Sequence, residues 1–145
     1  MAFPEPKPGL VIRYAFLWHE AAARGQEEGD KDRPCAIVMT TRNEGARPLV
    51  LVLPVTHSPP SDPDLAVEIP AQTKRRLGLD DQRSWIMVTD ANRFLWPGPD
   101  LRPREPGVAE SVVYGYLPAS VFNAVRDKLA HAIASRLSGI VPRTE

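Results

Sequence analysis

Residues 31–56, KDRPCAIVMTTRNEGARPLVLVLPVT, contain the clearest strand signals in the chain. Two runs rich in β-branched and aliphatic residues, 35–41 and 49–56, predict strands. Between them, Asn43 and Gly45 are suited to a tight reversal. The second run is apolar at almost every position, which is typical of a strand buried on both faces. The segment therefore predicts two neighbouring antiparallel strands, the second of them in the core.

Short apolar runs separated by loops continue on both sides of this segment. Sixteen prolines among 145 residues lie mostly between these runs and argue against a helical bundle. One helical turn is expected within 19–28 and another within 71–81, where Gly78 favours termination. No dozen-residue helical segments separate the strands, so a parallel sheet with crossover helices is not expected. Further strands are expected at 10–18, at 65–70 with Glu68 facing outward, at 84–90 and at 93–96.

The C-terminal part has a different period and predicts a helix. Apolar residues recur there at three- and four-residue steps, which places them on one helical face. Pro118 suits the first turn of this helix, and Gly139 suits its end. We therefore expect a mainly β fold, a small and strongly bent sheet or barrel, with this helix packed on it. The residues of the helical face are Val121, Phe122, Val125, Leu129, Ile133 and Leu137.

The composition limits the kinds of function. Hydrophobic residues make up 43% of the chain, and we expect a single domain over 9–145 after a flexible arm at 1–8. Eighteen basic and eighteen acidic residues give zero formal net charge, so a strong overall field that steers nucleic acid is absent. No apolar run approaches the roughly 20 residues that span a bilayer, and the N-terminus lacks a signal-peptide pattern. The single cysteine, Cys35, excludes an internal disulfide and fits a reducing cytoplasm.

Two strand ends carry the residues that could do chemistry. Arg33 and Pro34 lie where a polar segment becomes apolar, and Thr56 follows the next strand. Antiparallel pairing would place the guanidinium and the hydroxyl in one pocket, with Glu28 five residues upstream of Arg33. Such a set suits RNA cleavage by the 2′-hydroxyl, which needs a base, positive charge for the phosphorane and an acid for the 5′-oxygen. Arginine supplies a fixed fork of charged donors, and no metal is required.

The acid–base residues have simpler interpretations as well. Arg33 could pair with Asp30 or Asp32, and Thr56 could cap a strand end. Glu28 fits a solvated loop carboxylate at least as well as a base. Histidine has an ordinary pKa of about 6.5, which makes His57 a candidate acid or base. Strand alternation, however, would send the side chains of Thr56 and His57 to opposite faces if the strand extended as far as His57.

Possible RNA contacts also have two interpretations. Trp18 and Ser58 could bind RNA, whereas Trp85 and Trp96 lie inside apolar runs and fit a core. The charge run 74–76, with Lys74 and Arg75, could contact phosphate, although solvated surface is the commoner role. Cys35 fits a core residue and shows no metal-ligand spacing with His19, taken as a loop residue, or with His131 on the helix.

Taken together, these segments resemble the MazF/PemK (Kid) family of toxin endoribonucleases. PGLVIRYAF at 8–16 resembles the family's opening strand, and KDRPCAIVMT at 31–40 resembles its Arg-Pro strand. LVLPVTHS at 51–58 resembles the strand that ends in Thr-Ser. The segments LGLDDQRSWIMVTDANRFLW at 77–96 and GYLPASVFNAVRDKLAHAI at 115–133 resemble the later strand region and the closing helix. The similarity extends over nearly the whole chain in family order.

The resemblance implies an SH3-like β-barrel with a C-terminal helix, usually as a homodimer. It implies metal-independent cleavage of single-stranded RNA without a cofactor, and inhibition by a cognate antitoxin that fills the RNA groove. By motif position, Arg33 and Thr56 match the catalytic arginine and threonine. Glu28 matches an acidic residue of some members, and Arg93 matches an arginine that lines the RNA path or is structural.

The sequence also departs from the family pattern. Leu10 follows Gly9 where aspartate is common, His57 separates Thr56 from Ser58, and Ala91 replaces a frequent glutamine. Together with the zero net charge, these departures motivate a second hypothesis. It is a non-catalytic binding module on the same barrel, which binds a protein such as a gyrase-type target or binds RNA without cleaving it.

Overall fold

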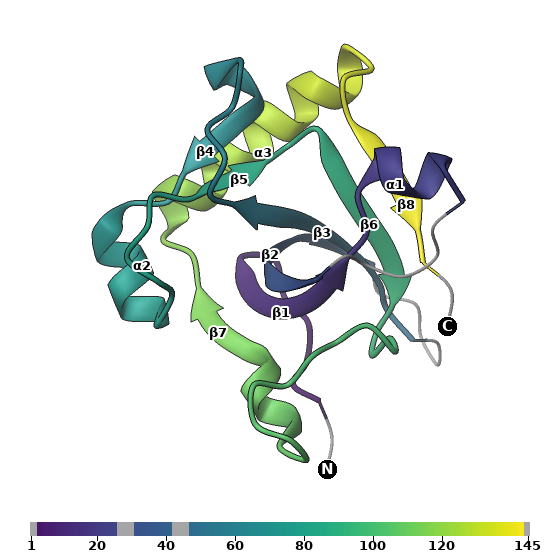
Figure 1. Cartoon of the computed structure of the whole chain (residues 1–145), viewed down its shortest axis with the longest axis vertical. Helices are drawn as coiled ribbons and strands as arrows, with labels where there is room; N and C mark the ends of the chain where they lie inside the picture. The colour runs from purple at the N-terminus through teal and green to yellow at the C-terminus, as the bar shows by residue number, and fades with distance from the viewer. Residues whose placement is uncertain (1–2, 26–30, 42–46, 144–145) are drawn as a thin grey trace.

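The computed structural model describes residues 3–25, 31–41 and 47–143, and shows a curled, mainly antiparallel sheet with one long helix near the C-terminus (Figure 1). This half-barrel confirms the predicted fold class, a small SH3-like bent sheet with a C-terminal helix. The strands are β1 (Leu10–Phe16), β2 (Lys31–Thr40), β3 (Leu49–Thr56), β4 (Ala66–Glu68), β5 (Trp85–Met87), β6 (Asp90–Leu95), β7 (Val113–Tyr116) and β8 (Gly139–Pro142). The helices are α1 (His19–Ala23), α2 (Ala71–Leu77) and α3 (Ala119–Ala134), with 3₁₀ turns at Pro63–Leu65 and Ala109–Val112.

The paired strands follow the order β4-β5-β3-β2-β1-β7, with β3 and β2 at the centre. Strand β6 also pairs with β3, and β8 pairs with β6. Strands β2 and β3 pair antiparallel with Cys35 opposite Pro54, as the sequence predicted. The turn assigned to Asn43 and Gly45 lies outside the described residues. Only the pairing of β6 with β8 is parallel among the described strands.

Strand β3 is buried on both faces because the core lies on both sides of the sheet. Its residues Leu51, Leu53 and Val55 pack with α3 side chains, whereas Val50 and Val52 pack with the aromatic rings of β1 and β6. Side chains alternate along a strand, so a strand between two hydrophobic layers must be apolar at every position. The apolar sequence of this strand therefore predicted its place correctly.

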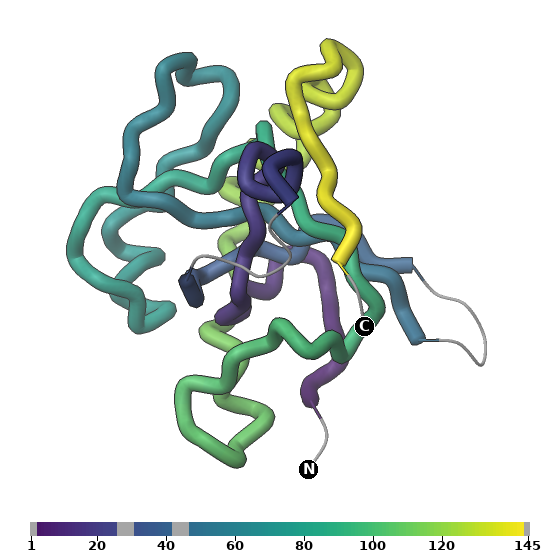
Figure 2. Tube along the Cα trace, turned by 45° about the vertical axis from the view of Figure 1, so that its right-hand side comes forward, coloured from purple at the N-terminus to yellow at the C-terminus, as the bar shows by residue number. Residues whose placement is uncertain are grey.

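The expected end of the closing helix was wrong. Helix α3 ends at Ala134, and Gly139 begins β8 instead, where the chain turns back beside β6 (Figure 2). The amide of Leu137 donates to the carbonyl of Ala132 beside Arg136 at φ 57°, a Schellman-type termination. Leu137 lies beyond this stop and is 50% exposed, and Ile133 is 45% exposed. Val121, Val125, Leu129 and Ala132 form the buried face.

Other boundaries differ from the expectations at the ends of the sheet. Strand β2 begins at Lys31, so Arg33 and Pro34 lie inside the strand rather than before it. The expected strand at 10–18 ends at Phe16, and His19 begins α1 rather than lying in a loop. Strands β7 and β8 were not predicted, because each is only four residues long and contains a glycine or a proline.

The described part of the N-terminal arm contacts the barrel. The indole of Trp96 donates to the carbonyl of Pro4 at 3.0 Å, and the rings of Phe3 and Trp96 meet edge to face. The flexibility of this arm and the single-domain boundary at residue 9 stay predictions. No helix among the described residues is long and apolar enough to cross a membrane.

Candidate functional site

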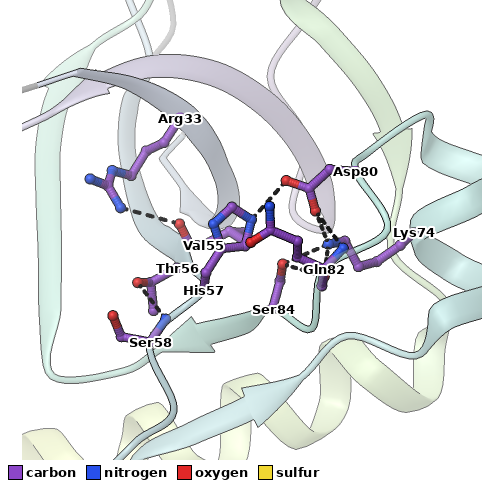
Figure 3. Close-up of polar contacts among 9 residues, drawn as sticks. All are labelled: Arg33, Val55, Thr56, His57, Ser58, Lys74, Asp80, Gln82 and Ser84. Atoms are coloured by element: carbon purple, nitrogen blue, oxygen red, sulfur yellow. Dashed lines mark hydrogen bonds and ion pairs between the residues drawn. The ribbon is translucent and has the colours of Figure 1, made fainter.

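The pairing of β2 with β3 places Arg33 beside Thr56. Cys35 lies opposite Pro54 at the last pair of this ladder, and Arg33 and Thr56 each lie two residues beyond it, at the same end of the sheet. The guanidinium Nη1 donates to the carbonyl of Val55 at 3.4 Å (Figure 3). The two side chains therefore reach the same end of the sheet from neighbouring strands.

Both side chains line one open hollow of about 550 Å³. Its lining includes residues at the ends of β2 and β3 and residues of the segment that follows α2. Since Arg33 and Thr56 are both half-buried, each can meet a ligand from solvent. The residues that line the hollow are Trp18, Lys31, Asp32, Arg33, Pro34, Val55, Thr56, His57, Ser58, Lys74, Gly78, Leu79, Asp80, Ser84 and Tyr114.

The Thr56 hydroxyl is oriented by the turn that ends β3. The amide of Ser58 donates to Thr56 Oγ1 at 3.2 Å, an interaction typical of Thr at a strand end. The described residues offer the hydroxyl proton no acceptor, so this proton is available to a ligand. The capping role and a ligand role are therefore compatible in one side chain.

Trp18 forms the aromatic wall of the hollow. The Arg33 guanidinium lies over its ring, 5.0 Å from the centroid, and Phe16 contacts the same indole edge to face. A cation over an indole face is attracted by the ring quadrupole and restricts the orientation of both groups. Trp18 also lines a second hollow of about 540 Å³ with His19, Asp90 and Arg136. By contrast, Trp85 and Trp96 are buried, as predicted.

Lys74 is a buried cation, so the solvated-surface interpretation was wrong for this residue. Its side chain is only 5% exposed, and Nζ donates to Asp80 Oδ1 at 2.5 Å and to Ser84 Oγ at 2.6 Å. A third contact reaches the carbonyl of Gln82. An ammonium has three protons, so all its donors are used within the protein.

Asp80 connects this buried cation to His57. Its Oδ2 lies 2.7 Å from His57 Nε2, and the two side chains are 46% and 47% exposed (Figure 3). The hydrogen bond from Lys74 lowers the pKa of Asp80 below its ordinary value, and His57 lowers it further, against partial desolvation. Both Thr56 and His57 line the hollow, so the separation to opposite faces that was expected if the strand reached His57 does not occur. Strand β3 ends at Thr56, and alternation does not extend into the turn.

The remaining predicted residues are distributed differently. Arg75, on α2, is exposed and lines a smaller hollow together with Glu68 and Arg83. Arg93 is exposed on β6 and is absent from the lining of the Arg33 hollow. Glu28 lies outside the described residues. The roles of all these residues in RNA binding or catalysis stay predictions.

Sequence reasoning missed Asp80 and Ser84, which complete the polar wall of the hollow. Only the spacing from Lys74 to Asp80 is visible in the sequence, and it indicates no more than the end of a helical turn. Asp32, considered as a partner of Arg33, pairs with Arg13 and Arg102 at 3.5 Å each. Among the described residues, no group of three His, Cys, Asp or Glu side chains could hold a metal ion.

Burial fixes the protonation of two further groups. Desolvation raises the pKa of Cys35, whose thiol is fully buried in the core, as predicted for a core residue. Desolvation also raises the pKa of Tyr114, so this phenol at the edge of the hollow stays protonated at neutral pH. Tyr114 can therefore donate a hydrogen bond but cannot act as a base.

The curled sheet and its cationic hollow define a small barrel protein with one polar site at the ends of two central strands. Residues 13–94, more than half of the chain, match the model of the PemK-like, MazF-like toxins of type II toxin–antitoxin systems. The chain belongs to this toxin family. The match begins in β1 and ends in β6, so it contains both strands that carry Arg33 and Thr56.

Comparison with solved structures supports the fold. A chain of the MazE–MazF crystal structure (Form-II) from Deinococcus radiodurans superposes with a TM-score of 0.51 at 19% sequence identity. The superposition covers 88% of this chain and 94% of that chain. No curated protein sequence matches the chain.

Proposed function

We propose that this protein is a metal-independent endoribonuclease that cleaves single-stranded RNA in the hollow between Arg33 and Thr56. The observation that carries the proposal is that the guanidinium and the hydroxyl line the same solvent-reachable hollow. Membership in a toxin family of type II toxin–antitoxin systems gives this hollow a biological context. Arg33 and Thr56 come from the two family-like strands that the sequence pointed to.

In the proposed reaction, the ribose 2′-oxygen attacks the adjacent phosphorus and the bond to the 5′-oxygen breaks. Arg33 donates to the non-bridging oxygens and to the departing 5′-oxygen, where negative charge develops. The Ser58 amide donates to Thr56 Oγ1 and does not use the hydroxyl proton. The Thr56 hydroxyl therefore donates this proton to a phosphate oxygen. A base must take the 2′-hydroxyl proton, and Glu28 and His57 are the two candidates.

Trp18 supplies a contact for a base next to the scissile phosphate. Stacking on an aromatic ring is tolerant of base identity and is effective on single strands, whose bases are unpaired. Because Trp18 lines two hollows, a strand bound at Arg33 could continue across the indole. Ser58 lies at the same rim and is proposed as a backbone contact.

The proposal includes a cognate antitoxin, a homodimer and a cytoplasmic location. The Deinococcus radiodurans protein of similar fold was crystallised as a MazE–MazF complex, which supports an antitoxin partner for this chain. An antitoxin that covers the hollow would compete with RNA. Light scattering of the purified protein would measure the number of chains in the particle.

The test is incubation of the pure protein with a long single-stranded RNA in EDTA, beside DNA of the same sequence. We expect the wild type to cleave RNA and not DNA, because DNA lacks the attacking 2′-hydroxyl. The Arg33→Ala variant should lose about 10²–10³ in rate, the usual cost of one donor to a developing oxyanion.

Equal cleavage by the wild type and Arg33→Ala would contradict the assigned site. RNA binding without any product would instead favour the binding-module hypothesis. An absence of both products and RNA affinity, with co-purification of another protein, would favour a protein target.

A further inference from the structure

A buried charge network lies behind the proposed active site and ends at His57. Lys74 on α2 is almost fully buried, yet it is surrounded by acceptors from the segment 80–84. A buried charge is expensive unless it is paired and hydrogen-bonded, so this network fixes the segment against α2. Asp80 is the one member of the network that also contacts a residue at the front of the hollow (Figure 3).

The two oxygens of Asp80 have different roles. Oδ1 accepts from Lys74 at 2.5 Å and from the amide of Gln82 at 3.1 Å. Oδ2 is thereby turned toward His57 Nε2, 2.7 Å away. An ionised carboxylate only accepts hydrogen bonds, and the pKa of Asp80 is lowered, so Nε2 must carry the proton. The other ring nitrogen, Nδ1, then has its lone pair available whenever His57 is neutral.

We propose that His57 is the general base of the reaction, and that Asp80 and Lys74 are positioning residues that fix its tautomer with Nδ1 as the proton acceptor. This inference rests on the proposed ribonuclease function and selects one of its two candidate bases. It assigns to Lys74 a role behind the site in place of a phosphate contact. A purely structural Lys74–Asp80 pair would not require a histidine on the second carboxylate oxygen.

The step balances within the hollow and solvent. His57 Nδ1 takes the proton of the 2′-hydroxyl as the bond from the 2′-oxygen to phosphorus forms. The 5′-oxygen leaves with the electrons of its bond to phosphorus and takes a proton from water. The resulting hydroxide is neutralised by the proton that His57 then releases, so no net acid or base is consumed. Asp80 stays ionised and stabilises the imidazolium ion while it exists.

Several charged or titratable groups face this histidine across the hollow. In the proposed reaction Lys31 and Arg33 stabilise phosphate, Lys74 is held by Asp80 and Ser84, and Tyr114 stays protonated. Among these groups, His57 has one ring nitrogen held by Asp80 and a second ring nitrogen that can accept a proton. The groups that line the same hollow are Lys31, Asp32, Arg33, Lys74, Asp80 and Tyr114.

The decisive variant is Asp80→Asn, with Asp81→Asn as the matched control. In Asp80→Asn, the new amide oxygen would stay with the two donors, Lys74 and the Gln82 amide, which places the amide NH₂ opposite His57 Nε2. Nε2 would then have to accept, and the proton would move to Nδ1. We expect the single-turnover rate of RNA cleavage in EDTA to fall about 10²–10⁴-fold with little change in RNA affinity. Asp81→Asn removes the same charge one residue away and should retain the wild-type rate.

Two further measurements do not depend on the folding of Asp80→Asn. His57→Gln replaces the exposed imidazole with an amide that cannot take the 2′-hydroxyl proton, so the single-turnover rate should fall about 10²–10⁴-fold. Nitrogen-15 NMR of the wild-type imidazoles should show the proton of neutral His57 on Nε2.

The inference is overturned if the wild type cleaves RNA and His57→Gln cleaves it at the same rate. It is also overturned if neutral His57 carries its proton on Nδ1 in the wild type, or if folded Asp80→Asn cleaves at the wild-type rate. An absence of cleavage by the wild type, in contrast, overturns the proposed function itself. The two failures are thus distinguishable in one set of assays.

Discussion

At the scale of single residues, Arg33 and Trp18 form a cation–π pair in the proposed RNA site. The guanidinium lies 5.0 Å from the indole centroid, so the cation restricts the ring and the ring restricts the cation. Arg33 also donates to the carbonyl of Val55. Both groups are therefore oriented before a ligand arrives, which lowers the conformational cost of binding.

Trp18→Ala should weaken the binding of single-stranded RNA by roughly tenfold to a hundredfold, because one base–aromatic stack contributes about 1–3 kcal/mol. Trp18→Phe keeps an aromatic face and should lose much less. Fluorescence anisotropy with a labelled oligonucleotide measures both. Tyr116→Ala, which removes an aromatic ring 46% exposed outside the hollow, serves as the control. Wild-type affinity in Trp18→Ala would exclude a stacking role.

Asp80 also predicts a pH dependence of stability. Its pKa is lowered in the folded protein, so its carboxylate stabilises the fold above the ordinary aspartate pKa of about 3.9. This contribution is lost as the pH falls through the lower, folded-state pKa. The difference in free energy of unfolding between wild type and Asp80→Asn should therefore narrow from about pH 5 downward. Urea unfolding at several pH values measures it, and a difference independent of pH would contradict the linkage.

At the scale of elements, the central strands were predictable and the edges were not. Strands β2 and β3 carry long runs of β-branched and aliphatic residues. Such runs are typical of strands that are buried on both faces. Strand β8 has only Val141 buried, so its sequence carries little of the alternation that marks a strand. Its partner strand β6 is 49 residues away at the first paired position, Asp90 with Gly139, and no local pattern reports such a contact.

The candidate site also has one part that the sequence predicted and one part that it did not. Arg33 and Thr56 could be found because neighbouring strands of a hairpin-like pair have a register that brings fixed positions together. The Lys74–Asp80–His57 connection could not be found, because it depends on how α2 packs beside the end of β3. A charge run on a short helix predicts solvated surface, whereas tertiary packing buried Lys74 and left Arg75 exposed.

The packing of β7 against α2 gives a prediction for stability. Gly115 has φ 141°, and an added Cβ would lie 2.8 Å from Leu77 Cδ2 in the core. Gly115→Ala should therefore cost about 2–3 kcal/mol from backbone strain and overpacking together. Gly107→Ala is the matched control, with φ 79° and no atom within 4 Å, and should cost about 1 kcal/mol. Equal losses in urea unfolding would show that the contact with Leu77 does not matter.

At the scale of the whole molecule, a chain of zero net charge places three of its basic side chains, Lys31, Arg33 and Lys74, in the lining of one hollow. With zero net charge, long-range steering of RNA is not expected, so the proposed recognition would depend on Arg33, Lys31 and the aromatic wall of the hollow. The family match extends over 13–94 and ends before α3, so the helix contributes to the fold outside the matched region. The segment from β1 to β6 therefore contains both the family match and the two strands that carry Arg33 and Thr56.

The most direct test is the single-turnover rate of cleavage of one RNA oligonucleotide in EDTA by four proteins. These are the wild type, Arg33→Ala, Thr56→Val and Arg126→Ala, the last a change of an exposed arginine on α3, away from the hollow. We predict cleavage by the wild type and Arg126→Ala at similar rates, and a loss of about 10²–10³ in the two variants of the hollow. Cleavage by Arg33→Ala and Thr56→Val at the wild-type rate would contradict the placement of the reaction between these two strands.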